Sequence, residues 1–472
     1  MDETILPLGS IADDTICALS TPPGSGGIAV VRVSGKEAVA ICSLLFRPVK
    51  GTALSGRASH TLVYGIFGEE DKPVDEVVTS LFKSPHSFTG EDVVEISCHG
   101  SLYIQQEILQ LLLKNGCRMA CAGEFTQRAF LNGKIDLSQA EAVADLIAST
   151  SAASHRLALS QLKGGFSCEL KLLRSEMLDF TSLIELELDF SEEDVEFADR
   201  AKLRELANHI ETVVSRLADS FRVGNAIKNG VPVAIVGETN AGKSTLLNLL
   251  LKEEKAIVSD IHGTTRDAIE DAISIGGVVF RFIDTAGIRK TSDVIECMGI
   301  ERTFQKIEQA SIVLWVVDCA SSEALTEALS KVIFPKTGEK ELVVLFNKCD
   351  LIEKAALERK LKLFETENIR CLPVSARKGT NIDTLEQLLP ELSGIDTLNE
   401  SDIVVTNVRH YEALVKTREA ILRIQEGLDN NISGDFLSQD IREAIHYLGE
   451  ITGEITTEEI LGNIFSKFCI GK

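Results

Sequence analysis

The chain has 472 residues and a formal net charge of -23, which gives enough length for about three domains and too much negative charge for nonspecific binding to a polyanion. Its longest wholly apolar runs, such as 312–317, are far shorter than the roughly 20 residues that cross a bilayer. We therefore expect no membrane passage, and a role on nucleic acid requires local basic patches or a partner.

The N-terminal stretch and the cysteines indicate a cellular compartment. The first residues, MDETILPLGS, lack the basic start and apolar run of a secretory signal. The 11 cysteines are scattered singly without a CxxC pair, which indicates reduced thiols rather than a disulfide framework. Both features predict a cytoplasmic protein.

The pattern of apolar residues divides the chain into four segments. Residues 1–130 mix β-rich runs (IAVVRVSG, VVEISCHG) with Gly- and Pro-containing turns and one apolar helix over 104–114, which predicts an α+β domain. Residues 131–228 and 395–472 show helical periodicity, whereas over 229–394 apolar β runs such as VPVAIVG and ELVVLFN alternate with helical stretches. We expect one discontinuous helical domain, with an α/β domain inserted between its two parts.

The inserted segment begins with a phosphate-binding motif. The strand VPVAIVG runs into GETNAGKST, where Gly237, Gly242, Lys243 and Ser244 match GxxxxGK[ST]. Backbone amides of the loop and of the first helical turn are expected to cradle phosphates, Lys243 to reach the β and γ oxygens, and Ser244 to ligate Mg²⁺. The predicted phosphate-binding stretch also includes Asn240, Ala241 and Thr245.

Two further motifs belong to the same phosphate chemistry. FIDTAG places Asp284 and Gly287 after a strand, where the carboxylate holds Mg²⁺ through water and the glycine amide senses a γ-phosphate. Thr285 and Ala286 lie between them and are counted with the site. In GTTRD, Thr265 is the candidate second protein ligand of Mg²⁺.

The motif NKCD predicts that the base is guanine. Asp350 can accept two hydrogen bonds from the N1 and amino donors of guanine, Lys348 can lie along the ring, and Asn347 can brace the loop. Adenine lacks that donor pair, and an unpaired buried acceptor penalises the wrong base. The stretch Ser375-Ala376-Arg377 follows the strand IRCLPVS, where a backbone amide is expected to contact guanine O6.

The hydrolytic apparatus differs from that of Ras-like enzymes, in which a glutamine follows DxxG and orients the attacking water. This chain has Ile288 there, so another polar group is required. Asn240 can offer its amide oxygen to a monovalent cation against the phosphates, and Glu296 can orient the water. From the residues alone, an Asn240 that only braces the loop is an equally good interpretation. The same holds for a Glu296 that is simply a solvated side chain.

At this point the chain resembles the tRNA modification GTPase MnmE (TrmE) family over essentially its whole length. The resemblance rests on TPPGSGG, SFTGED at 87–92, GEFTQRAFLNGKIDLSQAEAVADLI at 123–147, GETNAGKS, DIHGTTRD, DTAGIRK and the C-terminal FCIGK. It implies an N-terminal α+β domain that binds folate and dimerises, a discontinuous helical domain and an inserted Ras-like P-loop α/β G domain.

For the G domain, the resemblance implies pairing with a second copy in a potassium-dependent, GTP-bound state. Thr265 would then ligate Mg²⁺ and Glu296 would orient water as a catalytic residue, together with Lys243. The potassium ligands implied by the motifs are Asn240, Ser259, Ile261 and Thr264.

The resemblance also implies a site for a tetrahydrofolate derivative, such as 5,10-methylene- or 5-formyl-tetrahydrofolate. The matching positions are Arg32, Glu95, Lys134 and Lys472. A carboxylate such as Glu95 can pair with the adjacent N–H donors of a pterin, and the cationic groups can meet carboxylate or carbonyl oxygens. Without the resemblance, Arg32 and Lys134 would be interpreted as surface charges.

The C-terminal Cys-Ile-Gly-Lys follows a helix signal, and we expect Cys469 on a mobile tail that can reach a cofactor site. An incidental tail cysteine is the alternative. The resemblance implies that Cys469 acts in the modification of a tRNA wobble uridine at C5 to carboxymethylaminomethyl- or aminomethyluridine. The implied partner is the flavin- and NADH-dependent MnmG, in a heterotetramer or larger complex. The competing hypothesis is a GTP-dependent regulatory switch in ribosome assembly.

Overall fold

The computed structural model describes residues 14–189, 200–253, 271–283, 298–338, 340–364, 369–395, 403–430 and 432–472. The chain forms two compact units. The first comprises Met1–Ala144, Gln161–Ala207 and Ala420–Lys472, and the second comprises Asp145–Ser160 and Asn208–Glu419. The finer division into four segments at 130, 228 and 394 stays a prediction.

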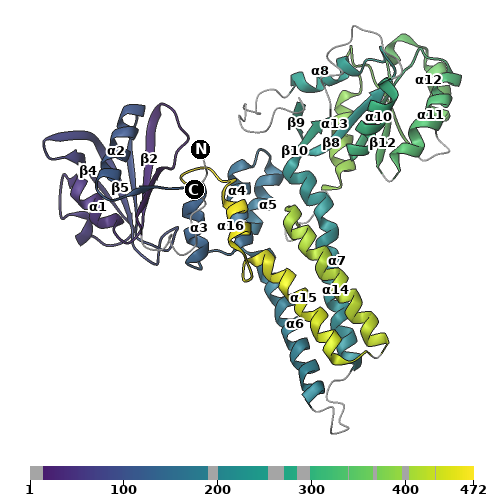
Figure 1. Ribbon diagram of the computed structural model, residues 1–472. Coiled ribbons are helices and arrows are strands. Elements are labelled where there is room, and N and C mark those ends of the chain that lie inside the picture. Colours follow the sequence, from purple (N-terminus) through teal and green to yellow (C-terminus); the bar gives the residue numbers. More distant parts are fainter. Residues whose placement is uncertain are drawn as a thin grey trace. The chain divides into compact units, whose positions relative to one another are not determined.

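The first unit contains a sheet with the strand order β3-β4-β5-β6-β2-β1-β7. Its strands β2, β4 and β5 are labelled in Figure 1. Neighbouring strands are antiparallel except β1 and β7, which are parallel. The strands are β1 (Ile16–Leu19), β2 (Gly26–Ser34), β3 (Phe46–Pro48), β4 (Thr61–Glu69), β5 (Lys72–Phe82), β6 (Val93–Gly100) and β7 (Arg118–Met119).

One face of this sheet is covered by α1 (Ala38–Leu45) and α2 (Leu102–Lys114). Alternation along β2 explains the two faces, because Ala29, Val31 and Val33 are buried in this core while Val30 and Arg32 point to the opposite face. The sequence patterns predicted α2 but neither α1 nor α3 (Glu124–Leu131), since eight-residue helices show barely two turns of periodicity.

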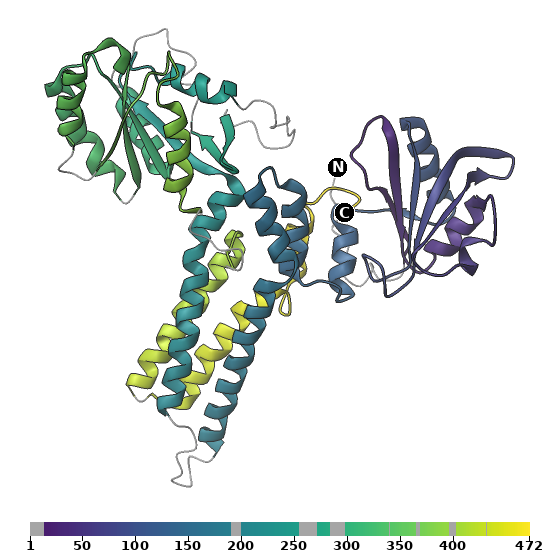
Figure 2. The same cartoon turned by 180° about the vertical axis from the view of Figure 1, so that it is seen from behind.

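The helical segments are α4 (Leu137–Ala148), α5 (Ala152–Leu162), α6 (Gly165–Asp189), α7 (Arg200–Asn229), α14 (Val408–Asp429), α15 (Gly434–Thr452) and α16 (Glu458–Phe465). Helices α6 and α15 run side by side (Figures 1 and 2). Arg174 of α6 contacts Glu454, just beyond α15, at 2.6 Å. In the second unit, the rings of Phe221 on α7 and Tyr411 on α14 stack at 4.6 Å. Helices on both sides of the inserted domain therefore pack together, as the predicted discontinuous helical domain requires.

The second unit contains a sheet with the order β13-β12-β11-β8-β10-β9. Its strands are β8 (Val231–Gly237), β9 (Asp271–Ile275), β10 (Val278–Phe282), β11 (Ile312–Asp318), β12 (Glu341–Asn347) and β13 (Arg370–Pro373), and only β9 pairs antiparallel. Continuous apolar runs such as β11 are buried because helices cover both faces. The covering helices are α8 (Lys243–Glu253), α10 (Met298–Gln309), α11 (Glu323–Thr337), α12 (Lys354–Lys362) and α13 (Ile382–Ser393).

The helices divide between the two faces of this second sheet. The core under α8 and α13 includes Leu246 and Leu385, whereas the core under α10 and α11 includes Ile307, Ile333 and Trp315. This arrangement confirms the predicted α/β domain. Strand β9 was not predicted, although Gly276 (φ 59°) and Gly277 (φ 80°) supply the two positive φ angles of a tight hairpin to β10. Within the described ranges, no helix has the length and apolar character needed to cross a membrane.

Candidate functional site

The loop between β8 and α8 requires glycine at two positions. Gly237 (φ 143°) and Gly242 (φ 99°) both have backbone angles that side chains disfavour. A Cβ on Gly237 would stand 2.2 Å from the Val316 carbonyl oxygen, and one on Gly242 would stand 2.1 Å from Asn347 Nδ2. The loop is therefore packed directly against the ends of β11 and β12, and Ser244 and Thr245 follow it in the first turn of α8.

Lys243 is held by the same loop. Its Nζ donates to the carbonyl oxygens of Gly237 at 2.7 Å and Glu238 at 2.6 Å. Burial lowers the pKa of this lysine below its usual value. The ammonium group thus lies at the start of α8, where backbone amides and the helix dipole favour an anion.

Asn347 joins the phosphate-binding loop to a second loop. Its side chain is buried, with Nδ2 donating to the Ala241 carbonyl at 2.8 Å and Oδ1 accepting from the Ala376 amide at 3.0 Å. A single amide group therefore fixes the spacing between the GETNAGKS and Ser375-Ala376-Arg377 segments, while the Arg377 side chain is exposed.

Lys348 crosses from the β12 end back to the phosphate-binding loop. Its Nζ donates to the Asn240 carbonyl at 2.8 Å and contacts Asp318 Oδ2 at 2.6 Å. Both Lys348 (φ 63°) and Asn240 (φ 63°) adopt left-handed backbone angles, which are uncommon for residues with side chains. Asp318 belongs to no motif that the sequence patterns singled out.

Asp350 lies in the same loop as Lys348, and its side chain is partly exposed. Its Oδ1 accepts from Ser375 Oγ at 2.7 Å, and its Oδ2 lies 3.2 Å from Lys378 Nζ. The hydrogen bond from Ser375, assisted by Lys378, lowers the pKa of Asp350, so the carboxylate is an acceptor at neutral pH. Lys378 was missed from the sequence because it follows the recognised stretch without a motif of its own.

The other predicted nucleotide and metal residues fall outside the described ranges. They are Ser259, Ile261, Thr264, Thr265, Asp284, Thr285, Ala286, Gly287, Ile288 and Glu296. Across the described part of the chain, no cluster of His, Cys, Asp and Glu suited to a metal ion occurs.

A second polar site lies on the face of the first sheet opposite α1 and α2. Arg32 of β2 is the strand neighbour of Glu95 of β6, and its Nε and Nη2 stand 2.9 and 2.8 Å from Glu95 Oε1. The guanidinium also lies 5.3 Å from the ring centre of Phe88 and 5.5 Å from that of Phe125. The Arg32 side chain is only 17% exposed, so the surface-charge alternative is wrong for this residue.

The loop that carries Phe88 is fixed by residues of α3 and just beyond it. Lys134 Nζ donates to the Pro85 carbonyl at 2.9 Å, and Asn132 Nδ2 donates to the Thr89 carbonyl at 2.7 Å. Arg128, buried in the first unit, contacts Glu91 at 3.2 Å. Lys134 itself is exposed, as the surface-charge alternative expects, but it packs on the loop that borders Arg32.

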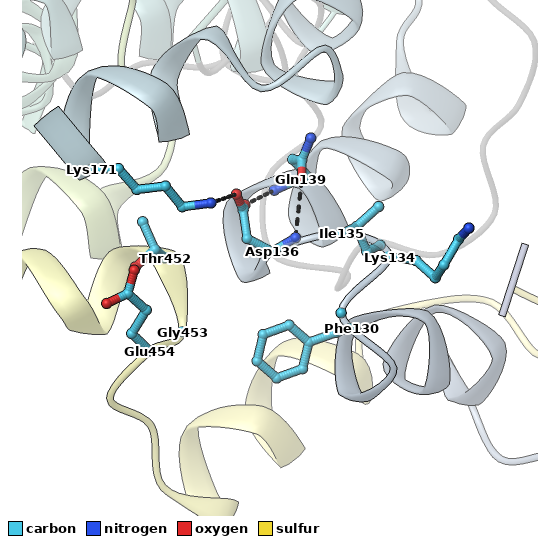
Figure 3. A pocket seen from close by; sticks show the side chains of 10 residues that line it. Phe130, Lys134, Ile135, Asp136, Gln139, Lys171, Thr452, Gly453 and Glu454 are labelled. Atoms are coloured by element: carbon cyan, nitrogen blue, oxygen red, sulfur yellow. Dashed lines mark hydrogen bonds and ion pairs between the residues drawn. The ribbon is translucent and has the colours of Figure 1, made fainter. Parts of the chain in front are cut away.

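Lys134 also lines a cleft of about 390 Å³ in the first unit (Figure 3). The ring of Phe130 forms one wall, and Lys171 reaches across to Asp136 at 3.8 Å. The remaining lining residues are Gly133, Ile135, Gln139, Thr452, Gly453 and Glu454.

The C-terminal tail is docked rather than mobile, which corrects the expectation from sequence. Ile470 forms an antiparallel bridge with Ala122, and the Gly471 carbonyl accepts from Ser20 Oγ at 3.2 Å. Gly471 (φ 94°) lies so close to β1 that a Cβ would stand 2.1 Å from the Leu19 carbonyl oxygen. The Ser20–Gly471 contact joins residues 451 positions apart, which local patterns do not reveal.

Docking brings the tail to the edge of the Arg32 site. Leu19 immediately follows Ala18, and Ala18 is the β1 partner of Arg32. Cys469 is exposed and Lys472 is half-buried at this position. The structure therefore brings Arg32 and Glu95 into direct contact, and places Lys134 and the tail against segments that flank them.

Two family models and several curated proteins match this chain over most of its length. The family model described as GTP-binding protein TrmE N-terminus matches residues 15–134, and the MnmE helical domain model matches residues 137–469. The tRNA modification GTPase MnmE of Bacteroides thetaiotaomicron is 62% identical over 463 residues, covering 97% of this chain and 99% of that protein. The Parabacteroides distasonis protein of the same name is 60% identical over 461 residues, covering 97% of this chain and 100% of that protein.

Solved structures of GTP-binding proteins match part of the chain. Era in complex with MgGDPNP and 16S ribosomal RNA nucleotides is 29% identical over 40% of this chain and 66% of that one, with a TM-score of 0.28. A GTP-binding protein from Sulfolobus solfataricus in complex with GDP is 20% identical over 47% of this chain and 67% of that one, with a TM-score of 0.27. From the two family models and the full-length relatives, the chain belongs to the MnmE (TrmE) family of tRNA modification GTPases.

Proposed function

We propose that the chain binds GTP with Mg²⁺ between the phosphate-binding loop and Asp350, and uses GTP hydrolysis to drive C5 modification of the tRNA wobble uridine. The observation that carries the nucleotide part is the pair of Asn347 hydrogen bonds, which link the phosphate loop directly to the Ala376 loop. Asp350 supplies an ionised acceptor for the two guanine donors. Ser244 in the first turn of α8 fits a Mg²⁺ ligand, and Thr265 would be the second.

Potassium is proposed to supply the positive charge that an arginine finger supplies in other GTPases. Asn240 presents an exposed side chain on the phosphate loop, while its carbonyl accepts from Lys348. The amide oxygen is a hard ligand suited to a monovalent cation, with Ser259, Ile261 and Thr264 as the other proposed ligands and Glu296 as the residue that orients water.

GTP turnover is therefore expected to be at least about tenfold faster in KCl than in NaCl, because the cation stabilises charge that develops in the transition state. It should also rise with protein concentration, since the cation is held when two G domains meet. Phosphate release at matched ionic strength measures both effects. The variant Asn240→Ala, which lacks one proposed potassium ligand, should show no difference in rate between the two salts. Equal wild-type rates in KCl and NaCl would contradict the potassium proposal.

The Arg32–Glu95 pair is the proposed centre of a site for a tetrahydrofolate one-carbon donor. The two side chains lie on one partly exposed sheet face, and the Arg32 guanidinium lies near the rings of Phe88 and Phe125, which suits a flat, polar ring system. Lys134 and Lys472 are the proposed flanking cations, and Cys469 is the proposed participant in the transfer chemistry.

Arg32→Ala is expected to weaken binding of 5-formyl-tetrahydrofolate by about tenfold or more, because it removes a charge-assisted hydrogen-bond donor. It should also lower the C5-modified wobble uridine in cells that carry it. Isothermal titration and mass spectrometry of tRNA nucleosides provide the two measurements. Lys72→Ala, an exposed cation on β5, is the matched control.

The outcomes of these two measurements separate the proposals. Wild-type protein that does not bind the folate would remove the donor site. Unchanged wobble uridines in cells without the protein would remove the modification role and leave the regulatory switch.

A second copy of the chain and the flavoprotein MnmG are the proposed partners, with tRNA as substrate. The sheet face that carries Arg32 and Glu95 also exposes Leu62 (73%), Tyr64 (50%) and Val78 (39%). The strand register places Leu62 across from Ser80 and Ser80 across from Glu95, so these side chains share one face. An open apolar face of this kind supports dimerisation of the N-terminal domain. The charge of -23 fits a complex in which MnmG makes most contacts to tRNA.

A further inference from the structure

The turn that follows β11 contacts both halves of the nucleotide site. Asp318, the last residue of β11, is the strand neighbour of Asn347. Its Oδ1 accepts from the Ala320 amide at 2.8 Å, which fixes the orientation of the carboxylate. Its Oδ2 accepts from Lys348 Nζ at 2.6 Å. The carboxylate therefore has one oxygen committed to its own turn and the other to the lysine of NKCD.

The same turn is tied to the phosphate-binding loop and to α12. Ser321 Oγ donates to Glu238 Oε2 at 3.1 Å, and Glu238 follows the first glycine of the loop. The Ser321 carbonyl accepts from Lys360 Nζ, and Lys360 is 6% exposed. Because the turn is anchored at both of these points, Asp318 is a fixed support rather than a mobile surface acid.

Lys348 has a particular need for such support. Its backbone is left-handed (φ 63°), and its four-carbon stem has many rotamers in solution. Two contacts hold the ammonium: the Asn240 carbonyl at 2.8 Å and Asp318 at 2.6 Å. Only Asp318 carries a full negative charge, and the side chains of Asp318 and Lys348 are 19% and 33% exposed, so their attraction is partly shielded from water.

We propose that Asp318 is a positioning residue for guanine-nucleotide binding, which holds the Lys348 stem along the plane where the base lies. This inference rests on the proposed nucleotide site. Asp350 selects the base because it accepts hydrogen bonds from the N–H groups of guanine. Asp318 instead acts through Lys348, so it sets the affinity for the nucleotide without distinguishing guanine from other purine bases of the same shape. Base contacts are equal in the ground and transition states, so the effect falls on binding and not on the chemical step.

Asp318→Asn keeps the size of the side chain and removes its charge. GDP and GTP binding are expected to weaken by about tenfold each, with KM raised by a similar factor and kcat unchanged. The preference for guanosine over inosine nucleotides should not change. Fluorescent-nucleotide titration and steady-state hydrolysis give these values. Asp383→Asn, an exposed acid in the first turn of α13, is the matched control and should bind as wild type.

A double-mutant cycle with Lys348→Met distinguishes positioning from general stability. If Asp318 acts through Lys348, Asp318→Asn adds no further loss of affinity in the Lys348→Met background. Asp318→Glu, which restores the charge, should recover part of the affinity. Wild-type affinity in Asp318→Asn, or losses that simply add in the double variant, would overturn the inference. Failure of the wild-type chain to bind guanine nucleotides would instead overturn the proposed nucleotide site.

Discussion

Replacing Asp350 by Asn is expected to weaken GTP binding by about 10⁴-fold, because a site built to pair with specific polar groups strongly rejects a ligand that leaves them unpaired. The carboxylate is held between Ser375 Oγ at 2.7 Å and Lys378 Nζ at 3.2 Å. Asn would present an amide N–H group to the amino group of guanine. Two donors would then face each other, and one hydrogen bond of the base would be lost.

The same change should create a preference for xanthosine triphosphate. Xanthine carries a carbonyl oxygen where guanine carries its amino group, so the amide introduced by Asp350→Asn can donate to it while the amide oxygen accepts from N1. Competition of both nucleotides against a fluorescent GDP analogue measures the exchange. Ser375→Ala, which removes one support of the carboxylate but keeps its charge, should weaken GTP far less. An unchanged ratio of GTP to xanthosine triphosphate affinity in Asp350→Asn would place base recognition elsewhere.

The sequence motifs of the nucleotide site could be predicted because each is a short run of residues with its own chemistry. GETNAGKS and NKCD need only neighbouring residues and a preceding buried strand, and β8 and β12 are such strands. The contact that supports NKCD from the end of β11 could not be predicted. Asp318 reaches Lys348 only because β11 and β12 pair in register, and that register depends on the whole sheet.

The second site shows the same limit more strongly. Arg32 and Glu95 are 63 residues apart in sequence and meet because β2 and β6 are antiparallel neighbours. Their positions came from a family resemblance, whereas periodicity alone left Arg32 as a surface charge. Docking of the tail depends on a still longer connection between Ser20 and Gly471. Apolar periodicity identifies elements, but it does not identify which polar residues the folded chain brings together.

Replacing Gly471 by Ala is expected to release the C-terminal tail and to lower wobble-uridine modification by more than about tenfold, because the tail conformation is open to glycine alone. The backbone angle is φ 94°, and the added Cβ would stand 2.1 Å from the Leu19 carbonyl oxygen and 3.1 Å from Ser20 Cα. Backbone atoms of a paired strand cannot move aside as a flexible side chain can. Cys469 and Lys472 would therefore leave the edge of the Arg32 site together.

GTP hydrolysis should stay within about twofold of wild type in Gly471→Ala, since a change at one site usually leaves a distant site with no shared partners unaffected. The described nucleotide-site residues belong to the second unit and the tail belongs to the first. Mass spectrometry of tRNA nucleosides from complemented cells, with phosphate release by the purified variant, measures both activities. Gly394→Ala is the matched control, because Gly394 (φ 69°) has a similar backbone strain with no atom within 4 Å of the added Cβ.

Deletion of residues 469–472 should reproduce the Gly471→Ala result, since both changes remove the same groups from the same place. Cys469→Ser then separates the thiol from the docking, because it keeps Gly471 and Lys472 in position while removing the thiol group. Loss of modification in Gly471→Ala but not in Cys469→Ser would assign the tail a binding role through Lys472. Full modification in Gly471→Ala would show that the docked tail takes no part in the reaction.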